Sequence, residues 1–70
     1  MLTDKIQYLV ALIAEFAAKY DLTDAQSMRY LQRYKALELC DKHYSVMHTL
    51  SFSNNVEGLA AYCKRMGGEL

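Results

Sequence analysis

The sequence contains only two cysteines among its 70 residues, and it contains neither proline nor tryptophan. Two cysteines are too few for the disulfide framework of a small secreted scaffold. Cys40 and Cys63 both fall on apolar helical stripes, where a free cysteine behaves as a small hydrophobic residue. We therefore expect both thiols to be structural and the protein to occupy a reducing compartment.

Charge of one sign is also missing, because eight acidic and eight basic residues give a net charge of zero without a like-charged run. Nucleic acids and anionic membranes attract basic patches, so we expect neither as a partner. A long uncharged apolar run is absent as well, since Asp4 and Lys5 precede the first apolar stretch and Glu15 interrupts it. This pattern excludes a signal peptide and a membrane-spanning helix, and it leaves a cytoplasmic protein as the default.

The apolar content, by contrast, is high, since 53% of the residues are hydrophobic and six are tyrosines. A chain of 70 residues is one domain (residues 1–70), near the lower size limit for a single core. Such a small domain cannot bury all of its apolar surface. We therefore expect part of that surface to be covered by a partner protein or by a second copy of the chain.

Apolar residues recur at spacings of three and four, which predicts an all-α fold. We predict a small single-domain bundle of four helices, over residues 3–20, 24–34, 37–49 and 55–66. The first helix is the longest, and the others should pack against its apolar face. The residues predicted to form that face are Ile6, Leu9, Val10, Ile13, Phe16, Ala17 and Tyr20. The join between the second and third helices has neither glycine nor proline, so one long bent helix is the alternative there.

The later helices carry matching apolar stripes. The third helix has a second apolar side formed by Leu39, Val46 and Leu50, which predicts that it is the most buried of the four. The residues predicted to face the core from the later helices are Met28, Leu31, Tyr34, Leu37, Cys40, Tyr44, Met47, Val56, Leu59, Cys63 and Met66.

Capping residues indicate where the helices begin and end. Thr3 can cap the first helix, and Thr23 with Gln26 forms the capping-box signature of the second. Asn54 is predicted to cap the last helix, after a loop of turn-forming residues. Two glycines at 67–68 should end that helix, because glycine takes a left-handed conformation without strain.

His43 and His48 are the first candidates for chemistry, but they are five residues apart, whereas a helical metal-binding pair is four apart. We therefore expect no metal ion. His48, with Thr49 and Ser51 close behind it, either forms a polar cluster that binds a ligand or serves as a general base, or interacts with the last carbonyls of its helix while Thr49 and Ser51 tie down the loop. We favour the structural interpretation. No acidic partner or nucleophile accompanies the histidine, so we expect no catalysis, no cofactor and no small-molecule substrate.

Tyr8, Leu12 and Tyr30 lie at or beyond the borders of the predicted core stripes. Another helix covers them, or they are exposed to a partner, since tyrosine is enriched at protein interfaces. The simpler explanation is a small core surrounded by aromatic rings. The sharper hypothesis is a docking face formed by these three side chains.

The second and third predicted helices also form a short, closely joined pair, as in a helix-turn-helix DNA-binding protein. The second helix of that motif usually begins with basic or amide side chains, whereas here it begins with KALEL at residues 35–39. Arg29, Arg33 and Lys35 could contact phosphates, but three charges in a neutral chain bind weakly. A small DNA-binding regulator is therefore the alternative function.

Several short motifs lie along the chain: FAAKY at 16–20, LT at 22–23, YL at 30–31, YSVMHTLS at 44–51, and a last helix that closes on GG at 67–68. Together they resemble the bacterial family of short proteins called domain of unknown function 3791. The Tyr-x-x-x-His-Thr-x-Ser element is the most specific of them. The resemblance implies a small helical protein, often encoded beside proteins that resemble ADP-ribosyltransferases, and hence an accessory or antitoxin-like binding partner. It implies no catalytic residues and leaves the roles of His48 and Thr49 open.

These observations together predict a non-catalytic protein-interaction module. Its expected partner is another protein or a second copy of itself, which would make a homodimer. The residues predicted to bind the partner are Tyr8, Leu12, Tyr30, His48, Thr49 and Ser51.

Overall fold

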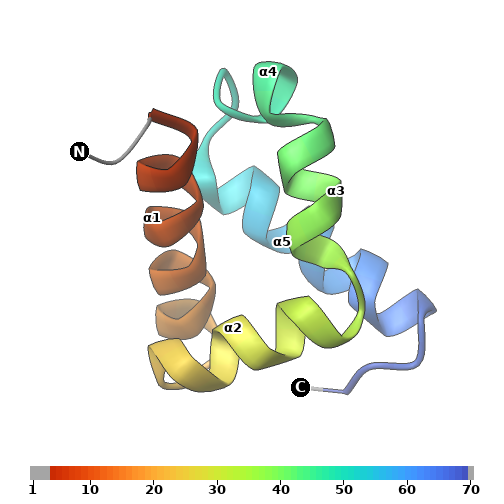
Figure 1. Cartoon of the computed structure of the whole chain (residues 1–70). Coiled ribbons are helices and arrows are strands. Elements are labelled where there is room, and N and C mark those ends of the chain that lie inside the picture. Colours follow the sequence, from red (N-terminus) through yellow and green to blue (C-terminus); the bar gives the residue numbers. More distant parts are fainter. Residues whose placement is uncertain (1–3, 70) are drawn as a thin grey trace.

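A computed structural model describes residues 4–69, and within this range the chain forms helices and no strand (Figure 1). The five helices of these residues are α1 (Asp4–Lys19), α2 (Asp24–Arg33), α3 (Ala36–Lys42), α4 (Tyr44–Met47) and α5 (Phe52–Arg65). The predicted all-α class is confirmed. None of these helices is long and apolar enough to cross a membrane.

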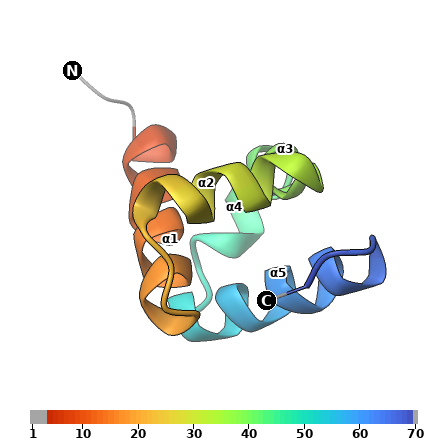
Figure 2. The ribbon, with the colours of Figure 1, turned by 90° about the horizontal axis from the view of Figure 1, so that it is seen from below.

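Three helices form a U, and the fourth long helix closes it. In Figure 1, α1 runs down the left side, α2 runs along the bottom, and α3 rises on the right. The long helix α5 packs against both α1 and α3 from behind, and in Figure 2 it lies below them. The short helix α4 joins α3 to α5 at the top of the U.

The core fills the space where these helices meet. Phe16, Leu31, Cys40 and Cys63 are fully buried, and each comes from a different one of the four longer helices. Burial of a large apolar side chain stabilises a fold by roughly 1.5–3 kcal/mol. Both cysteines are free thiols inside this core, which confirms that they pack as small hydrophobic residues.

The predicted core face of the first helix is confirmed only in part. Phe16 and Ala17 are buried as predicted, but Ile6 and Val10 are 44% and 56% exposed. Leu12, which was not predicted to face the core, is fully buried. A similar correction applies to α2, where Met28 is 44% exposed. Its place is taken by Ser27, which is fully buried and donates a hydrogen bond from Oγ to the Ile13 carbonyl oxygen over 2.8 Å. A small residue here lets α1 and α2 approach closely.

The ends of α1 and α2 follow local capping rules. Asp21 takes a left-handed conformation (φ 57°) after α1, and the Leu22 N–H donates to the Ala17 carbonyl over 2.8 Å. The predicted capping box of α2 is confirmed, since Gln26 N–H donates to Thr23 Oγ1 (3.1 Å) and Thr23 N–H donates to Gln26 Oε1 (2.8 Å). The other predicted cap, Thr3, lies outside the described residues.

The predicted third helix is divided in two. α2 and α3 are separate helices rather than one bent helix, because Lys35 between them is left-handed (φ 60°). A second break falls at His43 (φ −106°, ψ 17°), which separates α3 from α4. The prediction that this segment is the most buried is wrong. No residue of α4 is buried, and Val46 and Leu50 are 59% and 49% exposed.

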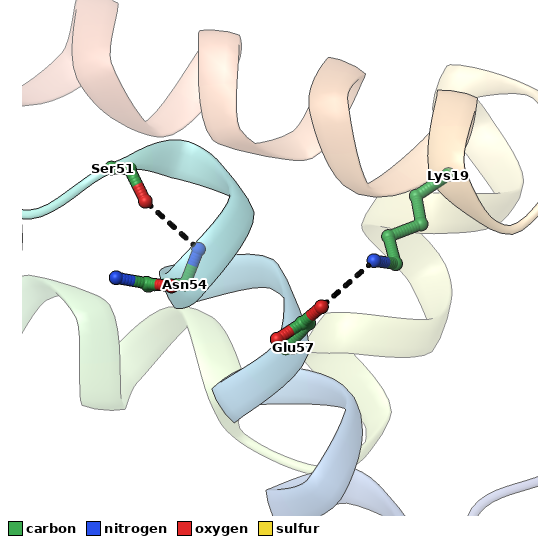
Figure 3. Close-up of polar contacts among 4 residues, drawn as sticks. All are labelled: Lys19, Ser51, Asn54 and Glu57. Atoms are coloured by element: carbon green, nitrogen blue, oxygen red, sulfur yellow. Dashed lines mark hydrogen bonds and ion pairs between the residues drawn. The ribbon is translucent and has the colours of Figure 1, made fainter.

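The last helix begins three residues earlier than predicted. Ser51, not Asn54, is its N-cap, and Ser51 Oγ accepts a hydrogen bond from the Asn54 N–H over 3.1 Å (Figure 3). The predicted loop before this helix is therefore mostly helical, because the Ser51 cap sets the first turn of α5 at Phe52.

The glycines end α5 as predicted. Gly67 is left-handed (φ 102°), and the Gly68 N–H donates to the Cys63 carbonyl over 2.8 Å. Met66 at this end is 58% exposed, so its predicted place in the core is wrong.

Candidate functional site

The Tyr44-to-Ser51 motif is built from contacts among its own residues. The His48 ring stacks on the Tyr44 ring with centroids 4.8 Å apart. His48 Nδ1 lies 2.8 Å from the Tyr44 carbonyl oxygen. A carbonyl oxygen only accepts, so Nδ1 must carry the proton, and Nε2 of a neutral ring is left as the acceptor. His48 itself is exposed.

The hydroxyls of Thr49 and Ser51 also form local hydrogen bonds. Thr49 Oγ1 donates to the Val46 carbonyl oxygen over 2.6 Å, which ties down the end of α4. Ser51 caps α5, as described above. No hydrogen bond joins His48 to a carboxylate within residues 4–69, and no group of three potential metal ligands occurs there. These contacts support the structural interpretation of the motif.

A hydrogen-bonded junction joins α1, α4 and α5 beneath this motif. The Asn55 side-chain N–H₂ donates to the Tyr8 hydroxyl oxygen (2.6 Å) and to the Met47 carbonyl oxygen (2.8 Å). The Tyr8 hydroxyl in turn donates to the same carbonyl over 3.2 Å. Burial raises the pKa of the Tyr8 phenol, and the hydrogen bond from Asn55 opposes this rise. Tyr8 is thus a structural link between helices.

The predicted docking residues therefore separate into three places. Leu12 is fully buried in the core, so the prediction that it lies on an exposed face is wrong. Tyr8 reaches the His48 motif through Tyr44, since the Tyr8 and Tyr44 ring centroids are 5.5 Å apart. Tyr30 belongs to a second aromatic cluster and packs against the Phe16 ring at 5.9 Å.

Tyr30 sits beneath the C-terminal turn. Its hydroxyl is buried and has no hydrogen-bond partner among the described residues. Burial raises the pKa of this phenol, and Cys63 adds to the rise. A Cβ atom at Gly68 would collide with the Tyr30 hydroxyl, so any other residue at that position would displace the Tyr30 side chain.

An apolar groove lies between α3–α4 and α5, and the sequence analysis did not predict it. The groove has a volume of about 350 Å³, and its lining includes Gly58 and Asn55 but no charged residue. The other residues that line it are Leu39, Met47, Leu50, Leu59, His43 and Asn54. Leu39 and Leu50 belong to the second apolar side of the predicted third helix, so this stripe, which predicts a buried core, is the sequence signal for the groove.

A second cleft, between the end of α1 and α5, is more polar. It has a volume of about 660 Å³ and is lined by both acidic and basic side chains. Lys19 Nζ lies 3.1 Å from Glu57 Oε1 across it (Figure 3). Lys19 thus pairs between helices rather than within α1.

The fold and these surfaces define a small all-α protein with an uncharged apolar groove. Residues 7–65 match the family described as Protein of unknown function (DUF3791), and the chain belongs to this family. Comparisons with curated proteins and with solved structures each found no match.

Proposed function

We propose that this protein is a non-catalytic protein-interaction module that binds an apolar helix of a partner protein in the groove between α3–α4 and α5. The observation that carries the proposal is the uncharged lining of this groove, together with the exposure of Leu50 on its wall. Grooves of this kind accept the apolar face of an amphipathic helix, with anchors at helical spacing. Each well-covered apolar anchor contributes about 1–3 kcal/mol to such binding.

The chemistry of the partner follows from the groove. Because no charged residue lines it, the segment that enters must be apolar where it meets Leu39, Met47 and Leu59. We further propose that this segment belongs to an ADP-ribosyltransferase-like protein, which the chain would serve as an accessory or antitoxin-like partner. This part of the proposal rests on the family resemblance rather than on the groove.

The DNA-binding alternative gains less support from the geometry. Two exposed residues of α3, Glu38 and Asp41, are acidic, and the phosphates of DNA would repel both of them. Ala36 at the start of α3 is fully buried and cannot contact a base.

The proposal is tested with a matched pair of variants. Leu50 and Val10 are 49% and 56% exposed, but Leu50 lines the groove and Val10 lies on α1. Leu50→Glu should weaken binding to a purified ADP-ribosyltransferase-like partner about tenfold or more in calorimetric titration, since it places a charge on the apolar wall of the groove. Val10→Glu should leave the affinity unchanged.

Two results would count against this function. If both substitutions weakened binding equally, the groove would not be part of the interface. If the ADP-ribosyltransferase-like protein bound neither the natural chain nor its variants, it would not be the partner. Light scattering at two protein concentrations tests whether a second copy of this chain, rather than another protein, occupies the groove. A mass that doubles with concentration, and that Leu50→Glu restores to 8.0 kDa, would identify a second copy as the occupant.

A further inference from the structure

Two arginines on α2 flank a third cleft, near the C-terminal end of the described chain. Arg29 and Arg33 are one helical turn apart, and both are exposed. The cleft has a volume of about 390 Å³, and its other lining residues are Tyr30, Tyr34, Gly67 and Glu69.

These arginines differ from the cations that link the helices. Lys5 pairs with Asp41 and Lys19 with Glu57, each over 3.1 Å. Neither arginine lies within ion-pair distance of a carboxylate anywhere in residues 4–69. Like charges at this helical spacing repel, so the pair destabilises α2 while no anion lies between its members.

The aromatic side of the cleft holds one arginine in place. The Arg33 guanidinium lies over the Tyr34 ring at 5.7 Å from its centroid. The Tyr34 ring in turn packs edge-on against the Tyr30 ring at 5.1 Å. An ordered guanidinium loses less rotamer freedom on binding, and its planar fork matches the two oxygens of a carboxylate or phosphate.

We propose that this cleft is an oxyanion site in which Arg29 and Arg33 together hold a carboxylate or phosphate group. Glu69 is the acidic residue of the lining, and it opposes binding from the other side of the cleft. The site does not depend on the apolar groove or on the partner proposed for it, because an oxyanion can be tested on the protein alone.

The test is a titration of ¹⁵N-labelled protein, followed through the arginine side-chain Nε–H signals. Inorganic phosphate and acetate are added separately at constant ionic strength. The signals of Arg29 and Arg33 should shift and saturate together, while the signal of Arg65 in the last turn of α5 should not. Saturation with phosphate alone would assign the site to phosphate, and saturation with both would assign it to oxyanions in general.

Substitutions complete the test. Arg29→Gln or Arg33→Gln should each weaken binding about fivefold or more, because each removes a charge-assisted hydrogen bond. Arg65→Gln is the matched control and should have no effect. Glu69→Gln should tighten binding by removing the opposing charge. Shifts that stay linear in anion concentration, or that Arg65 shares equally, would overturn the proposal.

Discussion

At the scale of single residues, two non-glycine positions occupy the left-handed region, Asp21 and Lys35. Aspartate tolerates this region better than most residues, but lysine has no such preference. Lys35 is exposed and marks the sharp turn from α2 to α3. It therefore stores a small amount of conformational strain that the sequence pattern alone did not reveal.

We expect Lys35→Gly to stabilise the protein by about 0.5–1 kcal/mol, because relief of the left-handed strain outweighs the added freedom of the unfolded chain. Urea unfolding measures the change. Lys42→Gly is the matched control, since Lys42 is also an exposed lysine but lies within α3, where glycine should destabilise. A Lys35→Gly variant less stable than the natural chain would contradict the assignment.

At the scale of helices, one hydroxyl group determines the residue at which α5 begins. Ser51 and Asn54 are both good N-cap residues, and the sequence alone favoured Asn54. The structure uses the Ser51 hydroxyl, while only the backbone of Asn54 takes part in the cap (Figure 3).

Ser51→Ala should therefore lower the free energy of unfolding by about 1 kcal/mol, since the first turn of α5 loses its side-chain acceptor. Asn54→Ala should change it little, because the Asn54 side chain caps nothing. Thermal melts of the two variants followed by circular dichroism give the comparison. A larger loss of stability in Asn54→Ala than in Ser51→Ala would show that Asn54 is the N-cap of α5.

The helical class and the α2 cap were predictable because both depend on neighbours within one turn. The core face of α1 was predictable only in part, since Phe16 and Ala17 are buried as predicted but Leu12 is buried in place of Ile6 and Val10. Apolar residues stand on several sides of α1, so periodicity alone cannot decide where the buried face ends. That choice depends on where α2 and α5 pack, which is a tertiary property. The groove was missed for a related reason, since an apolar stripe does not distinguish a core from an open surface.

At the scale of the whole molecule, the buried thiols link stability to pH. Burial raises the pKa of the Cys40 thiol from an ordinary 9.0 to about 11, and the neighbouring Cys63 adds to the rise. Above pH 9 the unfolded chain loses this proton while the folded chain keeps it. Stability is therefore fully present below that pH and falls as the pH rises toward about 11.

The expected loss is about 2–3 kcal/mol over this interval for a shift of this size. Urea unfolding at a series of pH values measures it. Cys40→Ala should be less stable at neutral pH but should show a shallower alkaline decline, and the difference in slope isolates the thiol from the tyrosines that titrate nearby. Equal slopes in the two proteins would show that Cys40 does not cause the decline.

The junction at the Met47 carbonyl has a consequence for the groove. A helix as short as α4 has no stability of its own, so its position depends on the Tyr8 hydroxyl and the Asn55 amide that meet at its last carbonyl oxygen. Met47 also lines the groove. The surface of the groove is therefore connected through these hydrogen bonds to α1, and a substitution at Tyr8 should change the position of Met47, although Tyr8 itself does not line the groove.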